Sequence, residues 1–220
     1  MGEKSEPIVR IFGILDITPE VVTMLVIIAL TAIVCFLVTR RLKERPGRFQ
    51  NVIEKGVEYL DGFFTDILGR ENARRYIWFL GSLFCFIIFA NYTGLIPGVG
   101  ISRFFKAPTS SLSVTLGLSI LAFLFIQISA IRRGAKHYLK HFLSPILPLL
   151  LMDELIKPAS LALRLFGNIF GEETITEQLY KILPIGAPIP IMALSLLFCA
   201  IQAMVYTMLT ASYLQEFIDE

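Results

Sequence analysis

The chain has 220 residues, of which 55% are hydrophobic and only 17% are charged, and its mean hydropathy is +0.69. This balance is typical of an integral membrane protein, and we expect no separate soluble domain. The formal net charge of +2 is uninformative by itself, and we expect no nucleic-acid partner.

Apolar segments follow one another along the chain at lengths that suit a bilayer, where a spanning helix needs about 20 mainly apolar residues. Four segments of sufficient length carry no charge: residues 21–39, 76–102, 107–131 and 182–215. A fifth, residues 141–170, is interrupted by Asp153, Glu154, Lys157 and Arg164. We therefore predict an all-α integral membrane protein with about five membrane-embedded helices in a single domain, residues 1–220.

The distribution of basic residues predicts how the chain is oriented in the membrane. Residues 40–75 hold nine of the twenty Lys and Arg residues, and residues 132–140 hold four more. Short loops rich in Lys and Arg are preferentially cytoplasmic. We therefore expect the N-terminal tail, residues 1–20, to lie outside and the C-terminus to lie in the cytoplasm.

The basic segment of residues 40–75 also contains a helical pattern. From Phe49 to Ile67 the apolar residues recur at spacings of three and four, which is typical of an amphipathic helix. We expect this cytoplasmic linker to lie on the membrane surface or against a partner, with a solvated linker helix as the alternative.

The last two apolar segments are longer than a bilayer is thick. About 29 residues make a helix of about 43 Å, against a hydrocarbon core of about 30 Å. Such helices must tilt strongly, bend or run out of the membrane. A turn at residues 181–190 lies between them, which predicts a helical hairpin over residues 141–215.

Arg164 lies inside the apolar stretch of residues 161–168. Its guanidinium stays protonated, and such a charge at the centre of a membrane helix costs about 2.5–3.5 kcal/mol. Glu172 lies at the edge of the helical face that carries Arg164, whereas Glu173 points almost the opposite way from Arg164. Polar and small residues share the face of Arg164: Asp153, Lys157, Ser160, Gly167, Asn168 and Gly171.

The counter-charge of Arg164 has two possible sources. An acid of its own chain would make the pair a bundle contact, which is common for intramembrane charges. The other four segments contain no acid, however, and Asp153 is three helical turns away. Small residues beside Arg164 also allow another helix to approach closely. These observations favour a carboxylate on another subunit.

The final segment places three polar residues on one helical face. Ser195, Gln202 and Tyr206 are spaced by seven and four residues. Gln202 either makes a hydrogen bond that packs two helices together or faces the polar line of Arg164 across the hairpin. The sequence leaves both interpretations open.

No pattern in the chain indicates covalent catalysis or metal binding. Cys35, Cys85 and Cys199 lie far apart in apolar segments and are interpreted as small buried residues. His137 and His141 lie in a basic turn without a carboxylate, which is a poor metal site. Patterns of a catalytic triad, a zinc protease or a nucleotide loop are missing from the sequence. We expect no cofactor, no metal and no catalysis by the chain itself.

Residues 161–168, Leu-Ala-Leu-Arg-Leu-Phe-Gly-Asn, resemble the signature of subunit a of the F-type ATP synthase. Residues 201–210 near the C-terminus also fit that family. Shorter motifs add support: residues 45–51, 91–97 and 107–116. The resemblance covers nearly the whole chain, and the arginine motif is its most specific part.

The resemblance implies a non-catalytic stator subunit of the Fo ion channel in a bacterial cell (inner) membrane. Its partners are then the rotating ring of c subunits, the b subunits of the peripheral stalk and the lipid bilayer. Two offset half-channels would carry H+ or Na+, and the ring rather than this chain sets which cation. The residues implied in translocation are Arg164, facing the ring, with Asn168, Glu172, Glu173, Ser195 and Gln202. The resemblance also implies that the helical hairpin of residues 141–215 is strongly tilted.

Two positions depart from the family pattern. Ser195 stands where many relatives have His or Glu, and Ser111 and Ser113 stand where some have Asp and Asn. The outer half-channel is therefore lined differently, and we expect Glu172 or Glu173 to be its titrating group.

The alternative function is a secondary transporter or small channel that works alone. A membrane enzyme is disfavoured because the chain lacks a nucleophile or metal cluster.

Overall fold

The computed structural model describes residues 9–11, 15–17, 19–40, 47–95, 107–142, 147–182 and 188–219. These residues are almost entirely helical, which confirms the predicted all-α membrane fold. A short 3-10 helix, η1 (Pro108–Ser110), precedes α4. The α-helices are α1 (Pro19–Arg40), α2 (Arg48–Leu68), α3 (Arg70–Gly94), α4 (Leu112–Phe142), α5 (Leu147–Ile182) and α6 (Pro188–Asp219).

A small β-hairpin in the N-terminal tail was not expected. Strand β1 (Val9–Ile11) pairs antiparallel with β2 (Leu15–Ile17), so that Arg10 lies opposite Asp16. Strands of three residues are too short to show the alternating pattern of about four to eight residues from which a strand is recognised in a sequence.

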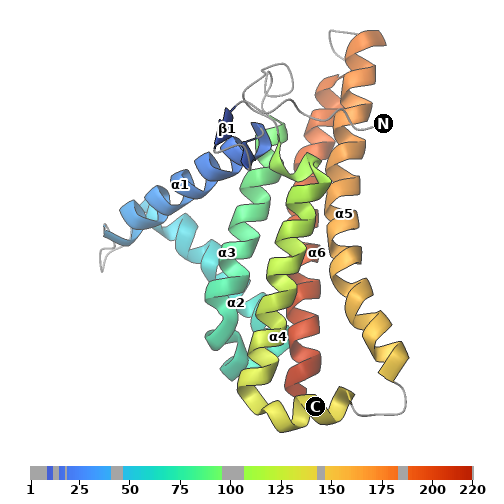
Figure 1. Ribbon diagram of the computed structural model, residues 1–220. Helices are drawn as coiled ribbons and strands as arrows, with labels where there is room; N and C mark the ends of the chain where they lie inside the picture. The colour runs from blue at the N-terminus through green and yellow to red at the C-terminus, as the bar shows by residue number, and fades with distance from the viewer. Residues whose placement is uncertain are drawn as a thin grey trace.

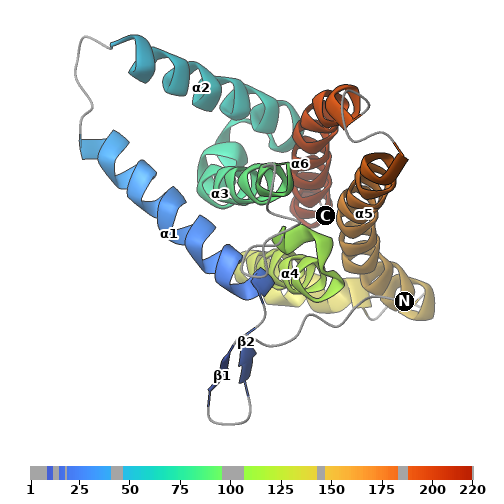
Figure 2. The ribbon, with the colours of Figure 1, turned by 90° about the horizontal axis from the view of Figure 1, so that it is seen from above.

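Helices α3, α4, α5 and α6 form the bundle of the molecule (Figure 1). Viewed from above, these four helices lie together, while α1 and α2 extend away from them on one side (Figure 2). The direction of the chain alternates from α3 to α6 (Figure 1). The C-terminal end of α3, η1 and the start of α6 therefore meet at one end of the bundle, called here the upper end. The start of α3 and the end of α6 lie at the lower end.

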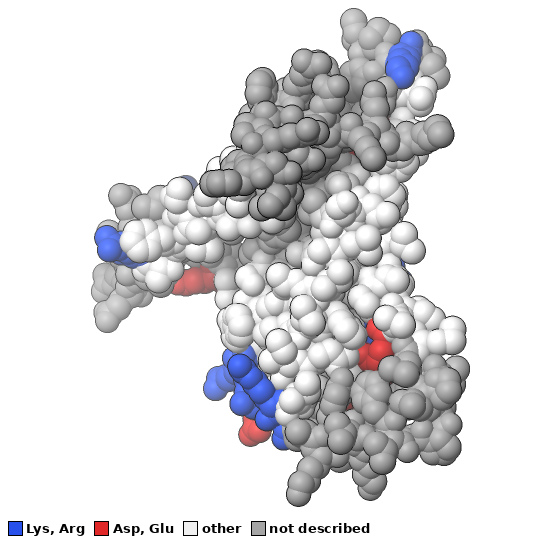
Figure 3. Space-filling model, in the orientation of Figure 1, with Lys and Arg blue, Asp and Glu red and all other residues white. Residues whose placement is uncertain are grey.

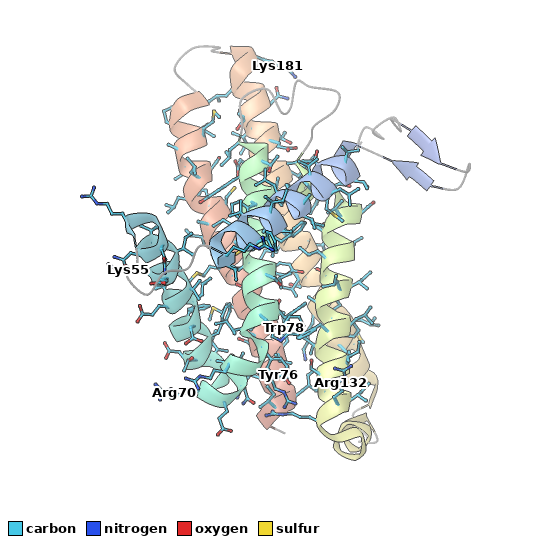
Figure 4. All side chains as sticks on the ribbon, turned by 90° about the vertical axis from the view of Figure 1, so that its left-hand side faces the viewer. Lys55, Arg70, Tyr76, Trp78, Arg132 and Lys181 are labelled. Atoms are coloured by element: carbon cyan, nitrogen blue, oxygen red, sulfur yellow. The ribbon has the colours of Figure 1, made fainter. Side chains whose placement is uncertain are left out.

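Charged side chains gather toward the ends of the bundle. Arg70 and Arg132 both lie at the lower end and Lys181 lies at the upper end (Figure 4). The face drawn in Figure 3 has a broad middle region with few charges, and Lys and Arg side chains lie below it. One residue of each basic segment thus lies at the lower end, whereas Lys55 of the first segment lies nearer the middle height of the bundle (Figure 4).

Three helices in the described part of the chain are long and apolar enough to cross a membrane. They comprise Arg70–Gly94, Leu112–Arg133 and Pro190–Ile218. Val21–Phe36 forms a shorter apolar helix within α1. The fifth predicted segment corresponds to α5, which packs against α4 and α6 despite its charges.

The predicted amphipathic linker is α2, and its apolar face divides into two parts. Phe64 and Leu68 near its C-terminal end are buried in the core formed by α3 and α6. Val52 and Val57 nearer its start are 71% and 55% exposed. The C-terminal part of α2 thus docks on the chain's own bundle, and the N-terminal part presents an apolar face outward.

The two longest helices are α5 and α6, with 36 and 32 residues. At about 1.5 Å per residue they extend about 54 and 48 Å, which exceeds the hydrocarbon core of about 30 Å. They lie side by side in opposite directions, as a helical hairpin requires (Figures 1 and 2). Helix α5 bends in its first third, the part that contains Pro158 (Figure 1). Helix α1 is strongly inclined to the bundle (Figure 1). The tilt of the hairpin in a bilayer stays a prediction.

Tyr206 of α6 is fully buried in the middle of the core, and its hydroxyl lies 3.3 Å from the Ser119 hydroxyl of α4. We expect Tyr206→Ala to leave a cavity and to lower the free energy of unfolding by about 3 kcal/mol. Tyr206→Phe removes one interhelical hydrogen bond and should cost about 0.6 kcal/mol. Thermal unfolding of the purified protein in detergent measures both changes. Equal losses in the two variants would show that Tyr206 does not pack as described.

Candidate functional site

Arg164 lies on the exposed side of α5. Apolar neighbours on the same helix are exposed with it, among them Leu163 (58%) and Phe170 (48%). Among the side chains that the structure describes, no hydrogen bond or ion pair reaches its guanidinium. The side chain of Asp153 lies outside the described residues. The arrangement favours a counter-charge from another subunit over an acid of the same chain.

Asn168 and Gln202 join α5 to α6 one turn above Arg164. Asn168 Nδ2 donates a hydrogen bond to Gln202 Oε1 at 2.8 Å. Gln202 is 4% exposed, and its buried Nε2 has no hydrogen-bond partner among the described residues. The bond packs the helices and also places Gln202 against the polar line of α5. The structure thus shows the interhelical hydrogen bond, and the role of Gln202 in an ion path stays a prediction.

The upper cluster is defined here as Glu172, Ser195, Cys199 and Asn91, which α5, α6 and α3 bring together. Cys199 Sγ lies 3.8 Å from Glu172 Oε2, and the Ser195 hydroxyl is hydrogen-bonded to the same carboxylate. Asn91 Nδ2 lies 3.5 Å from the Cys199 carbonyl oxygen. The structure thus brings two predicted residues, Glu172 and Ser195, together beneath the upper end of the bundle.

Glu173 points to a different neighbour. A Cβ atom built on Gly94 would lie 3.8 Å from Glu173 Oε1 and 3.1 Å from Ala107 Cβ. Glu173 therefore faces the end of α3 and the start of η1, where α5 also packs. The two adjacent glutamates therefore face different neighbours, which agrees with their separation of about 100° around a helix.

Two buried polar residues near this region were not singled out from the sequence. Asn91 and Thr109 are each 1% exposed. Asn91 Oδ1 and the Thr109 hydroxyl have no hydrogen-bond partner among the described residues. Both belong to motifs that carry the family resemblance, but only their burial identifies them, because buried polar groups are normally hydrogen-bonded.

The lower cluster is defined here as Glu154, Lys157, Glu216 and Gln127. Lys157 Nζ lies 3.1 Å from Glu154 Oε1 and 2.8 Å from Glu216 Oε2 of α6. Gln127 Nε2 of α4 donates to Glu154 Oε2 at 2.6 Å. Glu154 and Lys157 are 5% and 9% exposed. Three helices thus share one buried charged network near the lower end.

The structure adds to the sequence analysis at Lys157. Helical periodicity puts Lys157 on the same face of α5 as Arg164, and the structure shows that its side chain is buried between α5 and α6. The lysine stem is long enough to carry its charge away from that face toward the Glu216 carboxylate.

The two clusters lie on either side of Arg164 along the same helix. Lys157 precedes Arg164 by seven residues and Glu172 follows it by eight, which correspond to about 10 and 12 Å of helix. Each cluster contains carboxylates, which can bind and release a proton, and carboxylate and amide oxygens, which can ligate a small cation. No group of three or more metal-ligating side chains occurs in the part of the chain that the structure describes.

Comparisons with known proteins agree on one family. The family described as ATP synthase A chain matches residues 21–215. The ATP synthase subunit a of Moorella thermoacetica is 39% identical over 210 residues, covering 94% of this chain and 93% of that protein. The ATP synthase subunit a of Gloeobacter violaceus is 35% identical, covering 90% of this chain and 81% of its own length. Subunit a 3 of Pelobacter propionicus is 36% identical, with 88% and 85% covered.

Cross-linking can test whether Asn168 and Gln202 lie close together across the α5–α6 hairpin. With the native cysteines replaced by serine, we expect Asn168→Cys plus Gln202→Cys to be joined in most chains by a short bifunctional thiol reagent. The matched control, Leu163→Cys plus Gln202→Cys, should give only background, because Leu163 lies about 140° away from Asn168 around α5. Mass spectrometry of linked peptides reports the yield. Equal yields would contradict the described hairpin.

Proposed function

The chain belongs to the ATP synthase A chain family, and we propose that its Arg164 faces a rotating c-ring between two offset half-channels for H+ or Na+. As a family member it is a multi-pass membrane subunit of the Fo sector, acts in ion transport for ATP synthesis and is not the catalytic part. The observation that carries the proposal is an exposed Arg164, without an ion pair among the described residues, between two polar clusters.

The first step concerns the charge itself. An arginine in a membrane helix costs about 2.5–3.5 kcal/mol and usually pairs with another charge. Since no described side chain of the subunit pairs with Arg164, a carboxylate of another subunit is the partner that best offsets this cost. The c-ring supplies one such carboxylate per subunit in this family, and the b subunits are the expected stationary partners.

The second step concerns the surface around Arg164. Helices α5 and α6 both expose large apolar side chains, including Leu163, Phe170, Leu197 and Ile201. Such a surface suits the apolar flank of another helix assembly and excludes water from the Arg164 contact. Asn168 and Gln202 lie at the junction of the two helices and can orient a carboxylate beside Arg164.

The third step assigns the ion path. The upper cluster, with Glu173 and Thr109 beside it, provides the outer half-channel, because carboxylates and unpaired buried polar atoms suit water and cations. The lower cluster lies where the cytoplasmic half-channel would open. This orientation keeps the N-terminus outside and the C-terminus in the cytoplasm, and it places the chain in a bacterial inner membrane.

Rotation then follows from attraction and release. An ion entering the outer half-channel loads a ring carboxylate, which moves into the lipid as a neutral group and unloads after nearly a full turn. Arg164 attracts the unloaded carboxylate and prevents ions from passing straight between the half-channels. Each elementary charge that crosses 100 mV releases about 2.3 kcal/mol, so several ions are needed for one ATP. Water in the half-channels keeps the ion pair weak enough to separate.

The principal test is Arg164→Ala in the complete ATP synthase. We expect ATP-driven ion pumping to fall to the level of membranes without the complex, because nothing then attracts the unloaded carboxylate. The amount of c subunit that co-purifies with the chain should stay unchanged. Thr174→Ala, at an exposed position of the same helix, is the control and should pump normally. Normal pumping by Arg164→Ala would rule the mechanism out.

A second test concerns the outer half-channel. We expect Glu172→Gln plus Glu173→Gln to slow passive ion flux through Fo at least about tenfold, equivalent to about 1.4 kcal/mol on the barrier. Each single variant should slow the flux less, since the two carboxylates face different neighbours. Thr174→Ala, an exposed neighbour, serves as the control. An unchanged flux in the double variant would place the outer route elsewhere.

A further inference from the structure

The feature that carries a further inference is a second cation on the helix of Arg164. Lys157 precedes Arg164 by seven residues, so the Cα atoms of both lie within about 20° of one helical face and about 10 Å apart along the axis. A ring carboxylate attracted to Arg164 would be attracted to a free lysine ammonium as well. Two competing cations would hold the ring at two positions.

The structure shows that the Lys157 ammonium is engaged elsewhere. It contacts Glu154 on its own helix at 3.1 Å and Glu216 on α6 at 2.8 Å. Its Nζ also lies 5.4 Å from the ring centre of Tyr213 and 5.7 Å from that of Phe217. The side chain is 9% exposed, whereas Arg164 is classed as exposed. The Lys157 ammonium is thus held inside the protein, whereas the Arg164 side chain is exposed on the surface of α5.

The acids around Lys157 are themselves fixed in place. Glu154 is 5% exposed and receives the 2.6 Å hydrogen bond from Gln127 of α4. Glu216 reaches the ammonium from the end of α6 and keeps 42% of its side chain exposed. Among the described side chains, two carboxylates face one ammonium, which corresponds to a formal charge of −1. That charge repels an unloaded ring carboxylate and attracts a departing cation.

We propose that Glu154 and Glu216 are positioning residues that withhold Lys157 from the c-ring and leave Arg164 as the cation that the ring carboxylate meets. This inference rests on the proposed function. The same three side chains also clamp α5 to α6, and a merely structural clamp is the competing explanation. The two explanations differ in what removal of the lysine charge does once the acids have been neutralised.

The experiment measures ATP-driven ion pumping by the complete ATP synthase in membrane vesicles. Glu154→Gln plus Glu216→Gln releases the ammonium, and we expect pumping to fall at least about tenfold while the amount of complex is unchanged. Adding Lys157→Gln removes the competing charge and should restore at least about half of the lost rate. Glu58→Gln plus Glu71→Gln, two exposed acids, is the matched control and should pump normally.

Several results would overturn the inference. If the triple variant pumps as slowly as the double variant, or if the double variant pumps normally, Lys157 does not compete with Arg164. Loss of the chain from the membrane in the double variant, without recovery in the triple, would show a structural clamp. Glu216→Gln alone keeps the Glu154 contact and should reduce pumping about threefold with the complex intact. If Arg164→Ala abolishes pumping but the triple variant does not recover, the inference about Lys157 is wrong and the proposed function of Arg164 still holds.

Discussion

A guanidinium that stays charged inside an apolar helix is the constraint around which α5 and α6 are arranged. Arginine cannot lose its proton to enter lipid, so Arg164 needs a counter-charge or water. The described side chains offer it neither acid nor hydrogen bond, and apolar side chains are exposed beside it. The subunit is therefore energetically incomplete at this position, and the c-ring carboxylate completes it in the mechanism proposed.

Packing around α5 separates the polar groups according to their height in the bundle. Above Arg164, contacts with α3, η1 and α6 surround Glu172 and Glu173 with small or polar neighbours. Below Arg164, α4 and α6 contribute the amide and carboxylate that engage Lys157. A single continuous polar stripe would let ions pass straight along the helix. The proposed mechanism uses this division, with Arg164 between the two clusters.

Much of the fold was predictable from local patterns, and the errors have identifiable causes. Apolar segment lengths predicted the long helices, and spacings of three and four predicted α2. The β-hairpin of the N-terminal tail was not predicted, because its strands are only three residues long. The inward position of the Lys157 side chain was not predicted, because a helical wheel does not include the acid at the end of α6.

The sequence by itself determined that the chain enters a membrane, that its last two long helices are joined by a turn and that Arg164 carries a permanent charge in an apolar stretch, because hydropathy, helix length and permanent ionisation are local properties. Tertiary structure alone decided which polar residues meet. Glu172 joins Ser195 and Cys199, Glu173 faces the end of α3, and Lys157 reaches Glu216, which is 59 residues away. Such contacts depend on how distant helices pack, and helical periodicity specifies a face without naming the neighbour that covers it.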